Sequence, residues 1–258
     1  MLPHPHHPLV ISHRTNEGNA PENTLLGIAR AIEDGCDVVE VDVRATRDGV
    51  LVLLHDETLE RTTGDPRAIL DVTYEELSAI RTGAPQSHEP QPIPTLAEAY
   101  AAVLGADGTP QIVIEVDIPA RGIEGEVAAL IRSLHAEPYS LFTPSTEAEV
   151  RLTQRLLPDV PVFFDLTHDV LPPDELARRI RLAAALGVRA INPTFRALKP
   201  EAITLAHHLG LEVACWTVDA PEDLARMVAL GVDAITTNHP RRLLALLDAR
   251  PEPSSPAR

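Results

Sequence analysis

The sequence predicts a (β/α)8 barrel, a closed ring of eight parallel strands with helices outside. Short apolar runs rich in Val and Ile alternate with helix-like segments from residue 9 to residue 247. A repeat of strand and helix units of this kind builds a parallel sheet. Polar residues with catalytic potential follow several of the runs, as they do at the C-terminal rim of a barrel. We expect one domain over residues 1–250 and a disordered tail over residues 251–258.

Nine apolar runs are candidate strands. In chain order they are Leu9–His13, Val38–Val43, Val50–His55, Gln111–Asp117, Tyr139–Thr143, Val160–Leu166, Ala190–Asn192, Glu212–Val218 and Ala234–Asn238. Helix-like segments lie between most of them, and several begin at a capping residue, as Thr95 precedes Leu96. These segments are Thr24–Asp34, Leu96–Leu104, Glu124–Leu134, Thr146–Leu157, Asp174–Leu186, Pro200–Leu209, Pro221–Leu230 and Arg241–Leu247.

The nine runs exceed an eight-stranded barrel by one, and the third run accounts for the surplus. Only Arg44–Gly49 separates it from the second run, which is too short for a crossover helix. Asp48-Gly49 is a strong hairpin signal. We therefore predict that Val50–His55 folds back antiparallel as an added strand, and that the other eight runs close the barrel.

The segment 56–94 interrupts the alternation of strands and helices. It contains five prolines, and only Thr73–Ile80 within it has a helical pattern. Because it follows the strand that ends at His55, it is predicted to be an inserted lobe over one face of the barrel. Loops this long in a compact domain are usually functional.

Charge and hydropathy exclude two classes of function. The chain has 22 basic and 38 acidic residues, for a net charge of −16, which repels a nucleic-acid backbone. No stretch approaches the ~20 apolar residues of a membrane span. The N-terminus lacks the basic start and apolar core of a signal peptide, so a cytoplasmic location is expected. The oligomeric state stays open.

Two carboxylates in the second strand candidate point to a metal ion. Glu40 and Asp42 are two residues apart, so they face the same side of a strand. Inside a barrel they would repel each other unless a cation neutralised them, and hard oxygen ligands suit Mg²⁺, Ca²⁺ or Mn²⁺. Glu115 could be the third ligand. The alternative is that Glu40 and Asp42 point outward into solvent, but the outer face of the strand is the one that Val39 and Val41 are expected to occupy.

Other strand ends carry candidates for catalysis and substrate binding. His13 and His55 come from different strands and suggest a paired acid and base, because imidazole titrates near neutral pH. Arg14 could hold an anionic oxygen with its planar guanidinium, or it could form a salt bridge at the rim with Glu22 or Glu40. Trp216, the single tryptophan, either lines the substrate pocket or packs in the core.

These residues belong to an ordered set of motifs. The set comprises His13-Arg14, Ala20-Pro-Glu-Asn-Thr24, Val39-Glu-Val-Asp-Val43, Thr46-Arg-Asp-Gly49, Val52-Leu-Leu-His-Asp56, Arg61-Thr-Thr-Gly64, Ile93-Pro-Thr-Leu96, Ile114-Glu-Val116, Ile191-Asn-Pro193, Cys215-Trp-Thr-Val218 and Gly231-Val-Asp-Ala-Ile235. Together they resemble the glycerophosphodiester phosphodiesterase family. The resemblance covers about residues 9–247, and although each motif alone is weak, the ordered set is highly specific.

The resemblance implies a fold, a metal and a set of roles. It implies a (β/α)8 TIM barrel with an inserted lobe after the second catalytic histidine. The implied roles are metal ligands at Glu40, Asp42 and Glu115, acid/base catalysis at His13 and His55, phosphate binding at Arg14, orientation of the site by Glu22, and a pocket wall at Trp216. The implied cofactor is one divalent metal ion, Mg²⁺, Ca²⁺ or Mn²⁺.

Three residues depart from the family pattern. Thr15 replaces the glycine that usually follows His-Arg, and Asn238 replaces an acidic residue after the last strand. Asp117 stands where the family's Glu-x-Lys motif has lysine, which exchanges a phosphate-contacting cation for a carboxylate. One hypothesis is that Asp117 joins the other carboxylates to hold a second metal ion, which would restore the lost positive charge.

The expected function is metal-dependent hydrolysis of a glycerophosphodiester, or of a related small phosphodiester, to glycerol 3-phosphate and an alcohol. His13 is the expected base and His55 the expected acid, although the reverse assignment is compatible with the sequence. One alternative is a phospholipase D-like lyase that stops at a cyclic phosphate. Another is a homologue with weakened catalysis that binds phosphate or metal.

Overall fold

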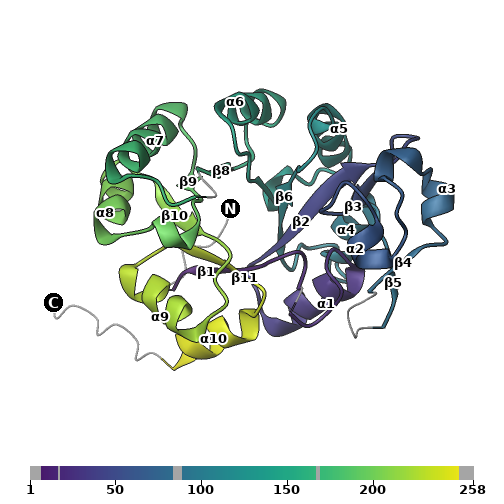
Figure 1. Cartoon of the computed structure of the whole chain (residues 1–258), viewed down its shortest axis with the longest axis horizontal. Coiled ribbons are helices and arrows are strands. Elements are labelled where there is room, and N and C mark those ends of the chain that lie inside the picture. Colours follow the sequence, from purple (N-terminus) through teal and green to yellow (C-terminus); the bar gives the residue numbers. More distant parts are fainter. Residues whose placement is uncertain (1–6, 17, 84–88, 167–168, 250–258) are drawn as a thin grey trace.

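The computed structural model describes residues 7–16, 18–83, 89–166 and 169–249, so the predicted tail lies outside the described residues. Eight parallel strands form a ring (Figure 1). They are β1 (Leu9–Ser12), β2 (Val38–Ala45), β6 (Val113–Asp117), β7 (Ser140–Phe142), β8 (Phe163–Phe164), β9 (Ala190–Ile191), β10 (Glu212–Cys215) and β11 (Ala234–Thr237). β11 pairs back onto β1, and a single bridge between Phe142 and Val162 joins β7 to the β8 segment. The predicted barrel is confirmed.

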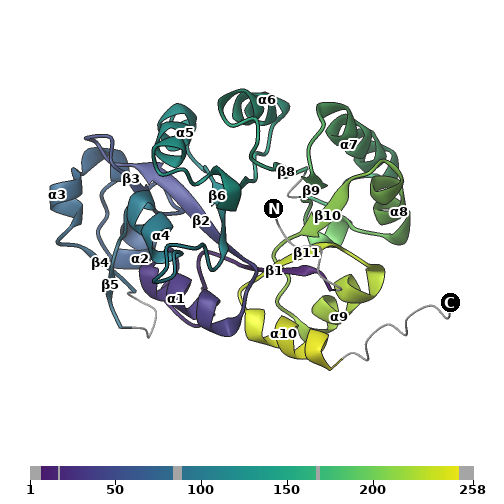
Figure 2. The same ribbon diagram turned by 180° about the vertical axis from the view of Figure 1, so that it is seen from behind.

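Eight helices surround the strands (Figures 1 and 2). They are α1 (Leu25–Asp34), α4 (Leu96–Ala102), α5 (Glu124–Ser133), α6 (Glu147–Leu156), α7 (Pro173–Leu186), α8 (Pro200–His208), α9 (Pro221–Leu230) and α10 (Pro240–Asp248). Thr95 caps α4 as predicted, in a reciprocal pair of hydrogen bonds with Glu98. Within the described residues, the helices are all too short or too polar to cross a membrane.

The core of the barrel has two parts because each strand alternates its side chains, and a third apolar cluster lies between β3 and the inserted lobe. Val39 and Val41 are fully buried beneath the helices, so the alternating residues Glu40 and Asp42 face the barrel interior. At the N-terminal end, a separate apolar cluster that includes Leu9 fills the inside of the barrel. The interior is thus closed by apolar packing at one end and polar toward the other.

The third strand candidate is an added strand, as predicted. β3 (Leu51–Leu53) pairs antiparallel with Val43–Ala45 at the end of β2 and takes no place in the ring. Gly49 in the turn has φ +82°, a conformation that glycine adopts without strain. The hairpin places His55 at the rim of the barrel.

The inserted lobe has more structure than the sequence indicates. It contains α2 (Glu60–Thr63), the 3₁₀ turn Ile69–Asp71, α3 (Tyr74–Leu77) and a two-stranded sheet of β4 (Arg81–Thr82) and β5 (Gln91–Pro92). The predicted helix at Thr73–Ile80 is shorter, and α2 and the sheet were not predicted. Both views place the lobe at the edge of the ring, not over a barrel face (Figures 1 and 2). The reason is that β3 pairs with the end of β2 and, through a single bridge, with Thr95 before α4, so the lobe begins outside the barrel wall.

Thr15 and Gly27 fit together where the chain leaves β1. Thr15 is fully buried and has φ +72°, which strains a β-branched residue. Its backbone N–H donates to the Glu40 carbonyl oxygen (2.8 Å), and its Oγ1 accepts from the Thr24 N–H (3.3 Å). A Cβ added at Gly27 in α1 would lie 2.0 Å from Thr15 Oγ1. Thr15 therefore occupies the space that the absent side chain of Gly27 leaves.

This fit predicts strong coupling between the two positions. Gly27→Ala alone is expected to lower the free energy of unfolding by roughly 2 kcal/mol, because it overpacks the contact with Thr15. In a Thr15→Gly background the same change should instead stabilise the protein by roughly 1 kcal/mol, through helix propensity. A double-mutant cycle in urea measures the coupling, and additive effects of the two substitutions would contradict it.

Candidate active site

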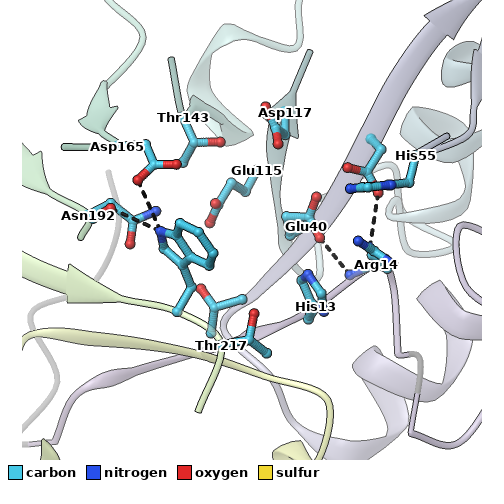
Figure 3. Close-up of a pocket in the computed structure, with 13 residues that line it drawn as sticks. His13, Arg14, Glu40, His55, Glu115, Asp117, Thr143, Asp165, Asn192 and Thr217 are labelled. Atoms are coloured by element: carbon cyan, nitrogen blue, oxygen red, sulfur yellow. Dashed lines mark hydrogen bonds and ion pairs between the residues drawn. The ribbon is translucent and has the colours of Figure 1, made fainter. Parts of the chain in front are cut away.

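A pocket of about 220 Å³ opens at the C-terminal ends of the barrel strands (Figure 3). Its walls include every predicted catalytic, metal-binding and substrate-binding residue, and also Asp117. The full lining is His13, Arg14, Glu40, Asp42, His55, Glu115, Asp117, Thr143, Asp165, Asn192, Trp216, Thr217 and Thr236. Glu22, by contrast, lies behind the wall and contacts the pocket through arginines. Asp165 and Asn192 were not predicted, although both lie at the C-terminal ends of strand candidates, the signal that identified the other residues.

Four carboxylates form a two-by-two layer on the inner wall. β2 and β6 are parallel neighbours, with Glu40 beside Glu115 and Asp42 beside Asp117. Ligand oxygens of Glu40, Asp42 and Asp117 lie within 4.8 Å of one another. The side chains face inward, so the alternative in which Glu40 and Asp42 point outward into solvent is wrong.

Burial and mutual repulsion disfavour the charged form of this layer. Burial, with the charges of Asp42 and Glu115, raises the pKa of Glu40 well above its usual range. The same two causes raise the pKa of Glu115 to about 8 and that of Asp117 to about 7. Glu115 is 3% exposed, and its Oε2 has no hydrogen-bond partner among the described residues. A set of buried oxygen ligands that lack enough neutralising charge fits a hard divalent cation.

Arg14 forms the predicted ion pair at the rim and also lines the pocket, so the two roles that the sequence left open are compatible. Its Nη1 lies 3.6 Å from Glu22 Oε1, so the salt bridge at the rim exists, and its Nε lies 3.7 Å from Asp42 Oδ2. Its guanidinium also lines the pocket. The contact with Glu40 runs through the backbone, since the Arg14 N–H donates to Glu40 Oε2 (2.6 Å). The Arg14 guanidinium is therefore positioned over the carboxylate layer, where an anionic oxygen could reach it.

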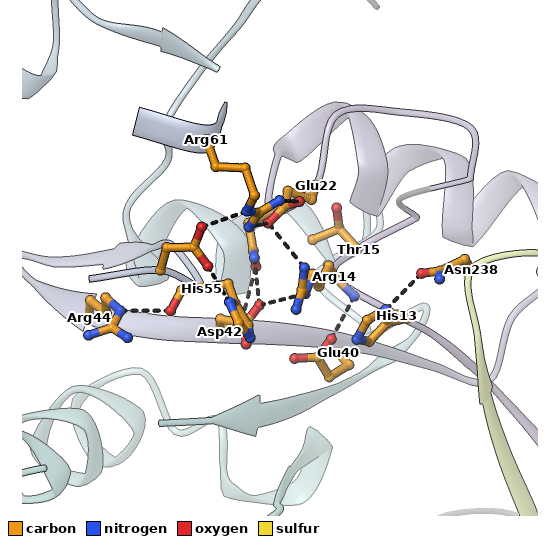
Figure 4. Close-up of polar contacts among 12 residues, drawn as sticks. His13, Arg14, Thr15, Glu22, Glu40, Asp42, Arg44, His55, Arg61 and Asn238 are labelled. Carbon is orange, nitrogen blue, oxygen red and sulfur yellow. Dashed lines mark hydrogen bonds and ion pairs between the residues drawn. The ribbon is translucent and has the colours of Figure 1, made fainter. Parts of the chain in front are cut away.

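His55 is held by a chain of charged contacts from the inserted lobe (Figure 4). Its Nδ1 lies 2.6 Å from Asp56 Oδ1, and Asp56 Oδ2 accepts from Arg61 Nε (2.5 Å). Arg61 also forms a bidentate pair with the buried Glu22, at 2.6 and 2.8 Å. Burial alone would raise the pKa of Asp56, but the hydrogen bonds from Arg61 and His55 lower it to about 2. Asp56 is therefore ionised at neutral pH, and His55 Nδ1 carries a proton.

His13 has a neutral partner instead. Its Nδ1 lies 2.7 Å from Asn238 Oδ1. Asn238 donates from its Nδ2 to Asp219 Oδ2 (2.9 Å) and from its backbone N–H to Asp219 Oδ1 (2.9 Å). This orientation leaves an amide oxygen facing the ring, which can only accept, so Nδ1 of His13 is protonated. Nε2 is then the ring nitrogen of His13 that can accept a proton.

Trp216 is fixed in the pocket wall opposite the histidines. Its Nε1–H donates to Asp165 Oδ1 (3.1 Å) and to the Asn192 carbonyl oxygen (3.0 Å). Because the indole is only half-buried and lines the pocket, one of its faces can contact a substrate.

The Arg61 contacts predict an effect at a distance from the pocket. Arg61→Met is expected to lower kcat by roughly tenfold to hundredfold, because Asp56 and His55 lose their fixed position. It should also cost roughly 2 kcal/mol of stability, since Glu22 remains buried with a weaker partner. Arg67→Met is the matched control, because Arg67 is in the same lobe but pairs with Asp65 outside the pocket. Steady-state kinetics on both variants test this, and equal kcat values would contradict it.

Known proteins resemble this chain over nearly its whole length. A glycerophosphodiester phosphodiesterase from Caldanaerobacter subterraneus subsp. tengcongensis is 31% identical, over 93% of this chain and 97% of the relative. One from Bacillus altitudinis is 28% identical, over 92% and 97%. The crystal structure of a protein from Silicibacter pomeroyi DSS-3, described as a putative glycerophosphoryl diester phosphodiesterase, matches with a TM-score of 0.81 and 29% identity, over 95% of both chains.

The sequence pattern of the glycerophosphoryl diester phosphodiesterase family matches residues 13–242. That span begins at His13 and includes all the residues of the pocket lining. With the barrel and the pocket in agreement, the chain belongs to the glycerophosphoryl diester phosphodiesterase family.

Proposed function

We propose that this protein hydrolyses glycerophosphodiesters, or a related small phosphodiester, to glycerol 3-phosphate and an alcohol, in a reaction that needs a divalent metal ion. The observation that carries the proposal is the placement of His13 and His55, with Arg14, around a layer of buried carboxylates in one pocket. Membership of the family and the names of its relatives support the substrate class.

The metal ion would be held by Glu40 and Asp42 together with a carboxylate from β6. The resemblance implies Glu115 as that third ligand, and Asp117 lies with Glu40 and Asp42 in the group whose ligand atoms are within 4.8 Å. When bound, a divalent cation polarises a phosphoryl group and acidifies a hydroxyl bound beside it. Mg²⁺, Ca²⁺ and Mn²⁺ all accept such oxygen ligands.

The partners of the two histidines support different roles. His13, with Nδ1–H held by a neutral amide, can accept a proton at Nε2 from the attacking hydroxyl. His55 donates its Nδ1–H to the Asp56 carboxylate, whereas the Nδ1 partner of His13 is an amide oxygen, so of the two rings His55 is the one whose cationic form would face an opposite charge. His55 is therefore suited to protonate the departing alcohol, and His13 to act as the base.

Two further side chains would orient the substrate. Arg14 can donate to a non-bridging phosphate oxygen while its contacts with Glu22 and Asp42 hold the guanidinium in place. Trp216, across the pocket, can pack against the carbon skeleton of the glycerol or the alcohol. The attacking group is either water or the glycerol 2-hydroxyl of the substrate.

The test is an assay of the metal-stripped protein. Glycerophosphocholine and glycerophosphoethanolamine are incubated with Mg²⁺, Ca²⁺ or Mn²⁺ restored one at a time, and products are followed by ³¹P NMR. We expect glycerol 3-phosphate with at least one metal, and no product without metal or with Asp42→Asn. A cyclic phosphate as the end product would instead establish a lyase, and the absence of any product with all three metals would contradict the proposal.

A further inference from the structure

When its carboxylates are ionised, as metal binding requires, the pocket contains more negative charge than one divalent cation can balance. Asp165 adds a fifth carboxylate to the four of the β2–β6 layer, and among the described residues that line the pocket Arg14 is the only Lys or Arg. Arg14 is itself shared with Glu22 behind the wall. One divalent cation and one arginine offset three of the five carboxylates. A phosphodiester anion entering the pocket would still meet excess negative charge, and the dianionic product of its hydrolysis would meet the same excess.

Two buried carbonyl or carboxylate oxygens in the pocket wall have no hydrogen-bond partner among the described residues. They are Oε2 of Glu115 and Oδ1 of Asn192, whose residues are 3% and 5% exposed. A buried carbonyl or carboxylate oxygen without a partner costs roughly 1–3 kcal/mol, so a ligand for it is expected. Both residues line the same pocket, from β6 and from the end of β9.

Asp165 lies beside these two oxygens. Its Oδ1 accepts from the Trp216 N–H that also donates to the Asn192 carbonyl. In Figure 3, Glu115 lies between Glu40 on one side and the pair Asp165 and Asn192 on the other. The pocket therefore has a second group of oxygens, separate from the group of Glu40, Asp42 and Asp117.

We propose that the pocket binds two divalent cations, one held by Glu40, Asp42 and Asp117 and the other by Glu115, Asp165 and the Asn192 Oδ1. Carboxylate and amide oxygens are the ligands that Mg²⁺, Ca²⁺ and Mn²⁺ take from proteins. The inference deepens the proposed function and rests on it only for the identity of the anion that the cations receive.

Metal binding without substrate tests the proposal. Metal-stripped protein is titrated with MnCl₂ in a calorimeter, and bound manganese is also counted by elemental analysis after equilibrium dialysis. We expect two ions per chain for the natural sequence. Asn192→Leu and Asp165→Asn should each reduce the count to one, because each removes a ligand of the second group and leaves the first group unchanged.

Thr236→Val is the matched control, because it also removes a buried polar atom from the pocket wall but lies on β11, away from both groups. It should still bind two ions. Circular dichroism and thermal unfolding establish that each variant is folded. One ion per chain in the natural sequence overturns the proposal, and so does a count of two that survives both substitutions. Because no turnover is measured, failure of the proposed phosphodiesterase activity gives a different result from failure of the second site.

Discussion

His55→Ala and His13→Ala are each expected to lower kcat on a glycerophosphodiester by roughly 10²–10⁴-fold, the usual contribution of a positioned acid or base. Both side chains line the pocket on the edge of the carboxylate layer, and each has its Nδ1 engaged by a neighbour. The loss should fall mainly on kcat, because neither histidine is needed to hold the metal or the phosphate in the proposed arrangement.

An aryl diester separates the two roles. Bis(p-nitrophenyl) phosphate releases an alcohol that leaves without protonation, so His55→Ala should retain most of its activity on this substrate. His13→Ala should remain impaired, because the nucleophile still has to lose a proton. If both variants lose the same factor on both substrates, the assignment of base and acid is refuted, although a shared catalytic role would stand.

His207→Ala is the control for both variants. His207 forms a histidine–aspartate pair with Asp233, at 2.8 Å, much as His55 does with Asp56, but it lies outside the pocket lining. Activity within about twofold of the natural sequence is expected for this variant. Loss of activity in His207→Ala would indicate that removal of a paired histidine disturbs the protein generally.

The sequence predicts the ring and the carboxylate layer because both depend on local periodicity. Glu40 and Asp42 alternate with Val39 and Val41, and an alternation of period two within a buried strand places carboxylates inward once the valines pack under helices. The hairpin could be predicted as well, since the residues between the second and third apolar runs are too few for a helix. The position of Asp42 beside Asp117 could not be predicted from either strand alone, because it depends on the register of β2 against β6.

The contacts behind the histidines could not be predicted, because they join residues far apart in the chain. Arg61 and Glu22 are 39 positions apart, and His13 and Asn238 are 225 apart. Nothing in the spacing of these residues encodes the contacts. The Arg61–Glu22 contact arises because the lobe, attached to the end of β2, returns Arg61 to the rim. The His13–Asn238 contact arises because β1 and β11 pair where the ring closes, with Ser12 beside Thr237.

Without metal, this protein should become less stable as the pH rises from about 5 to 9. Burial and mutual repulsion raise the pKa of Glu115 to about 8 and that of Asp117 to about 7 in the folded state, whereas both lie near 4 in an unfolded chain. Between these values the folded state binds more protons than the unfolded state, so the free energy of unfolding falls with pH. The two shifts correspond to a total loss of up to roughly 7 kcal/mol, or roughly 15–25 °C in Tm.

Two comparisons isolate the carboxylate layer as the cause. Asp117→Asn should raise the Tm of the metal-free protein at pH 8 and flatten its pH dependence, because one repelling charge is gone. Asp159→Asn, at an exposed carboxylate outside this pocket, should change neither.

Saturating Mn²⁺ should restore stability most at high pH, since the cation binds the ionised carboxylates and not their protonated forms. Differential scanning calorimetry of the three proteins measures all of this, and a Tm that rises with pH in the metal-free natural sequence would show that the layer is not a source of repulsion. The same acidic layer would then both prepare the pocket for cations and limit the stability of the empty barrel, so a substitution that stabilises the metal-free protein should weaken its binding of metal.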